Sequence, residues 1–186
     1  MSASLSLWLL ARDDQQQRLA RLVRELAPQH DGHVFEPHLT IQGDLASNEP
    51  DARAVLHELA RSTPLQRWTV RAVESTEHYF RSLYLRLDAG PAFDAMRRRC
   101  AERSGTDAGL SPYAHVSLAY GPTRGDAAAL RERLHHEHAG ETVEFDRLAL
   151  ARSGQAVAIA DWCVVASEPL SGSAGTPGTA DARYCA

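Results

Sequence analysis

The sequence of 186 residues contains no lysine, and all 20 of its basic residues are arginine. A phosphate-binding loop of the Walker A type needs a lysine, so that class of nucleotide site is excluded. Schiff-base chemistry and nucleotidyl transfer through a lysine adduct are excluded for the same reason. The formal net charge of −4 also argues against broad electrostatic binding of long nucleic acids. A small phosphate ligand held by a few local groups fits this composition better.

Long apolar runs and cysteines are also scarce. The sequence contains no run of about 18 apolar residues, so no transmembrane helix is expected. The apolar segment 1–10 lacks a basic leader and a cleavage site, so it predicts a strand rather than a signal peptide. Three cysteines without CxxC spacing argue against a disulfide framework or a zinc ribbon. We therefore expect Cys100 and Cys163 to be reduced packing residues and Cys185 to be exposed, in a monomeric cytoplasmic protein with no membrane partner.

The spacing of apolar residues predicts both helices and strands. Helices are expected at 15–26, 50–62, 91–103 and 127–138. Strands are expected at 4–11, 38–42, 66–74, 82–88, 115–120, 142–151 and 155–167. Asp13 and Asp14 are candidates to cap the first helix, and Asp126 is the candidate for the fourth.

Two halves of similar element order, joined near residue 90, predict an α+β protein of two similar lobes. Each lobe would contain an antiparallel sheet with flanking helices. One domain is expected over residues 1–170. Residues 171–186 are rich in Gly, Ser, Ala and Thr, which predicts a disordered tail.

Two short segments share the pattern histidine, apolar residue, hydroxyl residue, apolar residue. They are His-Leu-Thr-Ile at 38–41 and His-Val-Ser-Leu at 115–118. Along a strand, residues i and i+2 point to the same face, so each histidine shares a face with its hydroxyl residue. One such motif is expected about once by chance. Two at matching places in an apparent duplication indicate a paired site, and the alternative is two strand histidines bonded to backbone groups.

These motifs, with the flanking segments 35–40 and 115–121, resemble the 2H phosphoesterase superfamily, which is named for two such motifs. Within it, the sequence is most similar to the plant and fungal cyclic phosphodiesterases, over residues 4–168. The resemblance implies a bilobal fold with a pseudo-twofold axis, in which the motifs face each other across a central cleft. It also implies a reaction without a metal or another cofactor, in a pocket lined by the four motif side chains.

Opening a cyclic phosphate requires one group that takes a proton from water and another that protonates the leaving oxygen. Two histidines can hold these opposite protonation states near neutral pH. We therefore expect His38 and His115 to be catalytic, with the roles of acid and base left open. Thr40 and Ser117 would donate hydrogen bonds to the non-bridging phosphate oxygens. Tyr120 is either a packing residue or, as the resemblance suggests, a residue that positions the water.

A nucleoside substrate would need an aromatic surface to stack on. The candidates are Trp8, His78, Tyr79 and Phe80, and the alternative for the cluster at 78–80 is that one of its rings fills the core. Trp68 and Trp162 are expected in the core. The cluster at 135–138 lacks the HExxH spacing of a zinc site, so we expect a solvated helix end with no metal. The isolated histidines are expected at the surface: His30, His33 and His57.

The resemblance implies metal-independent hydrolysis of a small cyclic phosphate to a phosphomonoester. The substrate would be a 2′,3′-cyclic nucleotide or ADP-ribose 1″,2″-cyclic phosphate. One alternative is an RNA 2′,3′-cyclic phosphodiesterase or 2′-5′ RNA ligase-like enzyme acting on RNA 3′ ends, which a basic rim around the cleft would favour. The other is a non-catalytic module that binds a nucleotide.

Overall fold

The elements below come from a computed structural model that describes residues 4–45, 48–173 and 185. The strands are β1 (Leu5–Ala11), β2 (Leu39–Leu45), β3 (Gln66–Ser75), β4 (Leu83–Asp88), β5 (His115–Ala119), β6 (Thr142–Arg152) and β7 (Cys163–Pro169). The helices are α1 (Asp13–Leu26), α2 (Glu49–Ser62), α3 (Gly90–Ser104) and α4 (Ala127–His138). Single 3₁₀ turns occur at Ala27–Gln29, Tyr79–Arg81 and Ile159–Asp161. No helix among the described residues is long and apolar enough to cross a membrane.

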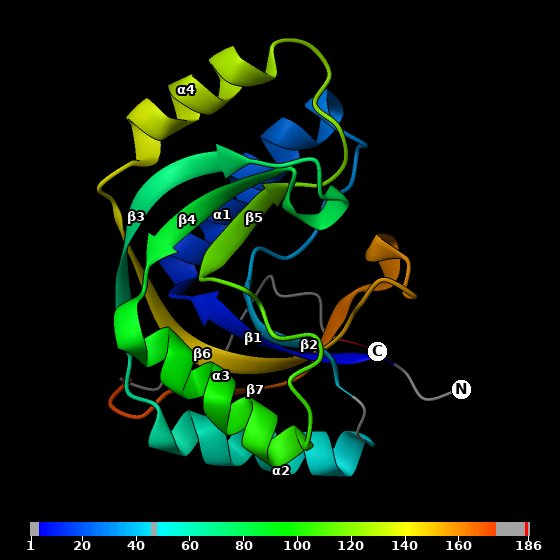
Figure 1. The fold of residues 1–186 in the computed structure, drawn as a ribbon, viewed down its shortest axis with the longest axis vertical. Helices are drawn as coiled ribbons and strands as arrows, with labels where there is room; N and C mark the ends of the chain where they lie inside the picture. Colours follow the sequence, from blue (N-terminus) through cyan, green and yellow to red (C-terminus); the bar gives the residue numbers. More distant parts are fainter. Residues whose placement is uncertain (1–3, 46–47, 174–184, 186) are drawn as a thin grey trace.

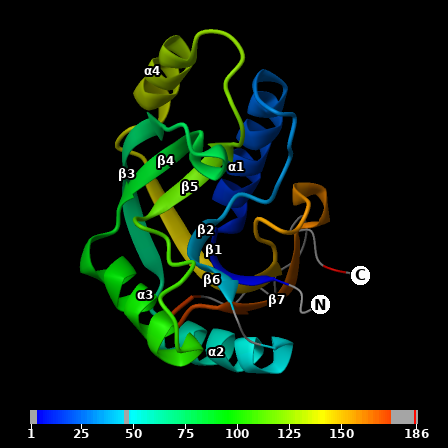
Figure 2. The same ribbon diagram turned by 45° about the vertical axis from the view of Figure 1, so that its right-hand side comes forward.

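The strands pair antiparallel in one sheet with the order β2-β1-β6-β3-β4-β5, and β7 also pairs with β6. Figure 1 shows that this sheet is strongly curled, with α2 and α3 along one side and α4 beyond β3. The turned view in Figure 2 shows α1 beside the curled sheet, away from α2 and α3. The α+β class and the antiparallel pairing are confirmed.

The element order β-α-β-α-β occurs twice, from β1 to β3 and from β4 to β6. Exchanging β1 with β4, β2 with β5 and β3 with β6 gives the same strand order, read from the opposite edge of the sheet. The helix packing repeats too, because α1 packs on β5 and α3 on β2, while α2 packs on β6 and α4 on β3. This topology has the expected pseudo-twofold symmetry. The lobe junction near residue 90 stays a prediction, since strands of both repeats join in one sheet.

The two motif-bearing strands, β2 and β5, lie at opposite ends of the strand order. The curl of the sheet brings them together through the segment that precedes β5. The Gly43 N–H donates to the Gly109 carbonyl at 2.8 Å, and the Ser111 N–H donates to the Ile41 carbonyl at 3.1 Å. The fully buried amide of Gln42 donates to three oxygens of residues 104–108 at 3.0–3.1 Å. These bonds close one end of the curled sheet.

Strand β1 is buried along its whole length, because it has an apolar layer on each face. Leu5, Leu7 and Leu9 contact the main core, which the helices cover. Trp8 and Leu10 point to the other face, into a second cluster rich in aromatic rings. This second cluster forms the floor of the site described below. In β3, Trp68 lies in the main core, as predicted.

The last hairpin differs from its prediction. Strands β6 and β7 pair, but β7 begins at Cys163 rather than at residue 155. The indole N–H of Trp162 donates to the Val157 carbonyl at 3.0 Å, so this segment folds back on itself instead of extending. The helix start also differs. Asp13 and Asp14 lie in the first turn of α1, where they suit the positive helix end, without capping it.

The prediction for the fourth helix is confirmed, since Asp126 Oδ1 accepts a hydrogen bond from the Ala129 N–H at 2.9 Å. This bond satisfies one of the backbone donors that the first helical turn leaves without an intrahelical partner.

The prediction of a reduced Cys163 is wrong, because Cys163 and Cys185 form a disulfide bond. The Cys185 N–H also donates to the Val164 carbonyl at 3.0 Å, so this residue lies against β7. Spacing rules could not show a contact between residues that are 22 apart. Cys100 is free and buried, as expected.

The predicted disordered tail falls mostly on residues 174–184 and 186, which lie outside the described residues. Of its described part, Ser171 donates its N–H to the Thr63 carbonyl at 2.9 Å.

Substitution of Gly109 would test how much the contact between the β2 edge and the segment before β5 contributes to stability. It has a φ of +74°, and an added Cβ would overlap the carbonyl oxygen of Gly43. Gly105 has a similar φ of +69° with open space around it. We expect Gly105→Ala to lower the free energy of unfolding by about 1 kcal/mol through backbone strain alone. Gly109→Ala should cost roughly 1–3 kcal/mol more, because the two edges must separate. Denaturant unfolding measures both, and equal losses would contradict the proposed closure.

Candidate active site

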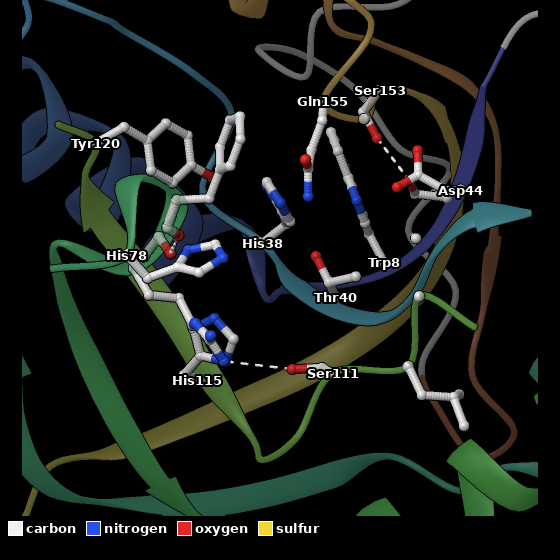
Figure 3. Close-up of a pocket in the computed structure, with 18 of the residues that line it drawn as sticks. Trp8, His38, Thr40, Asp44, His78, Ser111, His115, Tyr120, Ser153 and Gln155 are labelled. Atoms are coloured by element: carbon white, nitrogen blue, oxygen red, sulfur yellow. Dashed lines mark hydrogen bonds between the residues drawn. The ribbon is translucent and has the colours of Figure 1, made fainter. Parts of the chain in front are cut away.

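Both motifs open into one cavity of about 260 Å³. It is lined by residues of β1, β2 and β5, by the connections before β4 and β5, and by the connection between β6 and β7. All four motif side chains line it: His38, Thr40, His115 and Ser117. Figure 3 shows the imidazoles of His38 and His115 turned toward the same space. The structure thus brings together the residues that the paired motifs predict.

The two imidazoles are held by the same kind of bond. His38 Nδ1 lies 2.6 Å from the Glu36 carbonyl, and His115 Nδ1 lies 3.0 Å from the Tyr113 carbonyl. A carbonyl oxygen only accepts hydrogen bonds, so Nδ1 carries the hydrogen in both neutral rings. Each ring therefore keeps an unprotonated Nε2, which can accept a proton. Both carbonyls belong to the residue two positions upstream, as the duplicated topology would produce.

The pKa of each motif histidine is far below its ordinary value. Burial, together with the nearby charge of His115, lowers the pKa of His38 to about 4, while the bond to Glu36 opposes the shift. Burial also lowers the pKa of His115 to about 4, with Arg81 and Arg86 as further positive charges. Both rings are therefore neutral at pH 7. An anion between them would favour the protonated form of either ring.

Trp8 supports His38 directly. The two rings stack with centroids 3.7 Å apart and an angle of 11° between their planes. Trp8 is itself buried and lines the cavity. Its ring therefore fixes the orientation of the imidazole, and its predicted role in stacking on a base stays a prediction.

The hydroxyl groups of the motifs differ in their contacts. Ser117 donates a hydrogen bond to the Phe80 carbonyl at 3.0 Å. Thr40 is half-buried on the cavity wall. Tyr120 lines the cavity and also packs, since its ring stacks on Phe35 with centroids 4.0 Å apart. Burial raises the pKa of Tyr120, and a hydrogen bond with Ser117 opposes this shift. The Tyr120 hydroxyl therefore stays protonated and lies beside the second motif.

The other aromatic candidates are placed differently from one another. His78 and Phe80 line the cavity. Tyr79 is 38% exposed and is not among the lining residues. Trp162 is buried in the second cluster, as predicted for a core residue, and its ring also lines the cavity and stacks on Phe80 with centroids 6.0 Å apart. Only the predicted strand around Trp162 is wrong, because β7 begins at Cys163.

Sequence reasoning missed a set of polar residues around the motifs. Ser111 lies beside the ring of His115, with its Oγ 3.3 Å from Nδ1. Asp44 and Gln155 line the opposite end of the cavity, near Trp8 (Figure 3). Asp44 has a φ of +48°, a left-handed conformation that non-glycine residues rarely adopt. Arg81 lines the end near His115. None of these residues belongs to a motif, so only the fold reveals them.

The surface prediction for His30 is wrong, because this residue is only 1% exposed. Its Nδ1 lies 3.2 Å from the Leu26 carbonyl and its Nε2 lies 3.1 Å from Thr123 Oγ1. His57 is exposed, as expected, beside Glu168. Within residues 4–45, 48–173 and 185, no group of three or more His, Cys, Asp or Glu side chains is arranged to hold a metal ion.

Comparison with known proteins identifies the family. Residues 11–156 match the 2′-5′ RNA ligase superfamily, so the chain belongs to that family. Its members carry out phosphoester chemistry, which supports an enzyme of the phosphoesterase class. No curated protein sequence matches the chain.

Several solved structures share the fold. The protein TT0787 of Thermus thermophilus is 17% identical, with a TM-score of 0.58 over 91% of this chain and 99% of that chain. E. coli LigT complexed with 3′-AMP is 10% identical, with a TM-score of 0.61 over 92% and 99%. E. coli LigT complexed with NADP+ is 11% identical, with a TM-score of 0.60 over 91% and 99%. At these identities the likeness shows the fold alone.

The low histidine pKa values predict a loss of stability in acid. Unfolded histidine has a pKa of about 6.5, so below that pH the unfolded state binds more protons than the folded state, whose His38 has a pKa of about 4. From pH 7 to pH 5, His38 alone should remove roughly 2 kcal/mol from the free energy of unfolding. His38→Gln should flatten this pH dependence, and His136→Gln, at an exposed position, should not. Denaturant unfolding at both pH values measures this, and parallel curves for all three proteins would refute the burial argument.

Proposed function

We propose that this protein hydrolyses a small cyclic phosphate to a phosphomonoester by paired-histidine acid–base catalysis, without a metal or other cofactor. The substrate is a 2′,3′-cyclic nucleotide or ADP-ribose 1″,2″-cyclic phosphate. The observation that carries the proposal is the convergence of both motifs on one cavity. Each of the two imidazoles there has a free Nε2 and an Nδ1 fixed by a backbone carbonyl.

In this reaction a water attacks the phosphorus while the bond to one ester oxygen breaks. One histidine Nε2 takes the water proton, and the other, protonated when the anionic substrate binds, gives a proton to the leaving oxygen. Thr40 and Ser117 donate hydrogen bonds to the non-bridging oxygens as their charge grows. For Ser117 this means exchanging its bond to the Phe80 carbonyl for one to the substrate. The Tyr120 hydroxyl, beside Ser117, would orient the water.

A nucleotide substrate is supported by the aromatic wall of the cavity. Phe80 and Trp162 stack on each other and offer ring surface next to His38. The structures of E. coli LigT complexed with 3′-AMP, ATP and NADP+ show that a protein of this fold accommodates nucleotides. Of these ligands, 3′-AMP is a phosphomonoester of the kind that the proposed reaction would release.

The second candidate is an RNA 2′,3′-cyclic phosphodiesterase or a 2′-5′ RNA ligase-like enzyme. The family match and the arginine at the cavity end near His115 favour it. A non-catalytic nucleotide-binding module has no such support, because both motifs are intact. A monomeric state and a cytoplasmic location stay predictions, and the Cys163–Cys185 disulfide argues for an oxidising compartment.

The main test is hydrolysis of 2′,3′-cyclic AMP in the presence of EDTA, followed by chromatography of the products. We expect full activity with the chelator. His38→Ala or His115→Ala should lower kcat by about 10²–10⁴-fold, because each removes one proton transfer. Thr40→Ala or Ser117→Ala should lower it about tenfold, because each removes one hydrogen bond. His136→Ala is the matched control at an exposed position. Loss of activity with EDTA, or a larger loss in His136→Ala than in His115→Ala, would refute the proposal.

The pH dependence gives a separate test. Catalysis needs one neutral and one protonated histidine, so both kcat and kcat/KM should have bell-shaped pH profiles. The profile of kcat/KM reports the free enzyme, in which both pKa values are about 4. The substrate phosphate raises both pKa values in the complex, so the optimum of kcat should lie at a higher pH than the optimum of kcat/KM. Initial rates between about pH 2.5 and pH 9 measure both, and coincident optima would contradict this assignment.

A further inference from the structure

The end of the cavity near His115 carries an unusual concentration of positive charge. Arg81 lies in the turn before β4 and lines the cavity. Arg86 lies on β4 directly opposite His115 in the strand pairing. The charges of both arginines lower the pKa of His115, so both guanidinium groups are close to the imidazole. His78 lines the same end of the cavity.

One tyrosine ring lies beside both guanidinium groups. The Cζ of Arg86 is 3.6 Å from the centroid of the Tyr113 ring, and the Cζ of Arg81 is 5.6 Å from it. The Tyr113 and Tyr84 hydroxyl groups are hydrogen-bonded at 2.9 Å. The Tyr84 hydroxyl in turn donates a hydrogen bond to the Glu74 carboxylate at 2.7 Å. The tyrosines therefore fix the ring that supports the arginines, and Glu74 is engaged by Tyr84.

Neither arginine has an acidic partner in the described part of the chain. Among the described residues, no carboxylate oxygen lies within 4.0 Å of either guanidinium group. The Nε of Arg81 is buried and has no hydrogen-bond partner in that part of the chain. Two like charges held near one ring repel each other, and a bound anion would relieve this repulsion. Arginine is the side chain best suited to bind phosphate oxygens through several N–H groups.

The opposite end of the cavity has a different character. Asp44 lines it, together with Ser6, Ser153 and Gln155. Arg81 is the one arginine that lines the cavity within the described part of the chain. A phosphate group would be repelled by Asp44 and attracted by Arg81. The cavity is therefore polarised along its length, with the reacting site between its two ends.

We infer that Arg81, supported by Arg86 and Tyr113, binds a second phosphate group of the substrate, apart from the one that reacts. This inference rests on the proposed function and narrows its substrate class to cyclic phosphates that carry another phosphoryl group. That group is a 5′-phosphate, the internal phosphodiester of a short RNA, or the pyrophosphate of an ADP-ribose derivative. All three present the same oxygens to a guanidinium group, and a nucleoside cyclic phosphate without one leaves Arg81 unused.

The test compares four substrates: 2′,3′-cyclic AMP, its 5′-phosphorylated form, the dinucleotide ApA with a 2′,3′-cyclic phosphate, and ADP-ribose 1″,2″-cyclic phosphate. Each is assayed with the wild type, Arg81→Ala, Arg81→Lys and Arg98→Ala. Arg98 is exposed on α3, outside the cavity lining, so its variant controls for net charge. Arg81→Ala should lower kcat/KM for one or more of the doubly phosphorylated substrates by about 10- to 100-fold more than for 2′,3′-cyclic AMP. Arg81→Lys should retain part of this preference.

The substrate with the largest ratio identifies the source of the second phosphate. An equal loss on all four substrates would show that Arg81 acts on the reacting phosphate or on His115, and would overturn the inference. An equal loss in Arg98→Ala would reduce the effect to general charge, with the same consequence. Thermal unfolding of each variant identifies losses of kcat/KM that come from misfolding. If Arg81→Ala is misfolded, Arg81→Lys is compared with the wild type instead.

A binding experiment separates this inference from the proposed function. If none of the four substrates is hydrolysed, the proposed function fails, but calorimetry with adenosine 3′-monophosphate and adenosine 3′,5′-bisphosphate still tests Arg81. The wild type should bind the bisphosphate about tenfold more tightly, and Arg81→Ala should remove that difference. Equal affinities for the two ligands in the wild type, with no preferred substrate in the assay, would refute the second phosphate site.

Discussion

The closure of the curled sheet is the constraint on which the site depends. The motif strands β2 and β5 lie at opposite ends of the strand order, so a flat sheet would hold the two histidines far apart. Backbone hydrogen bonds between Gly43 and Gly109, and between Ile41 and Ser111, instead join these edges. The absence of a side chain at Gly109 permits this close approach. The same bonds protect the exposed edge of β2, which would otherwise offer unpaired backbone groups to other chains.

Burial then determines the chemical state of the site. Each histidine donates a hydrogen bond from Nδ1 to the carbonyl two residues before it in the sequence, which leaves Nε2 as the reactive atom. Burial lowers the pKa of both rings, so neither ring carries a charge at pH 7. A neutral pair in a buried setting responds strongly to an incoming anion, because the charge of the ligand is poorly screened there. In the proposed function, the substrate thus creates the protonation state that its own cleavage requires.

The sequence predicted the parts of this protein that local patterns encode. All four helices and the first six strands lie close to their predicted ranges, because apolar periodicity marks most of them, and a proline and an aspartate cap mark the starts of α3 and α4. The paired motifs located His38 and His115, because a strand places residues i and i+2 on one face. The start of the last strand was predicted too early, because the segment before β7 folds back on itself, with hydrogen bonds from Val157 to Gly154 and from Trp162 to Val157. The Cys163–Cys185 disulfide and the cluster of arginines around Tyr113 depend on contacts between distant segments, which no spacing rule contains.

The duplicated strand order has a consequence for chain connectivity. Leu5, at the start of β1, pairs with Arg152, at the end of β6, just as Leu83, at the start of β4, pairs with Ser75, at the end of β3. The end of each repeat therefore lies beside the start of the other repeat. A circularly permuted chain that begins at β4 and runs through a short hairpin from β6 into β1 would rebuild the same sheet, with β7 as the one strand left to reattach. Which repeat comes first along the polypeptide is therefore of little importance to the architecture.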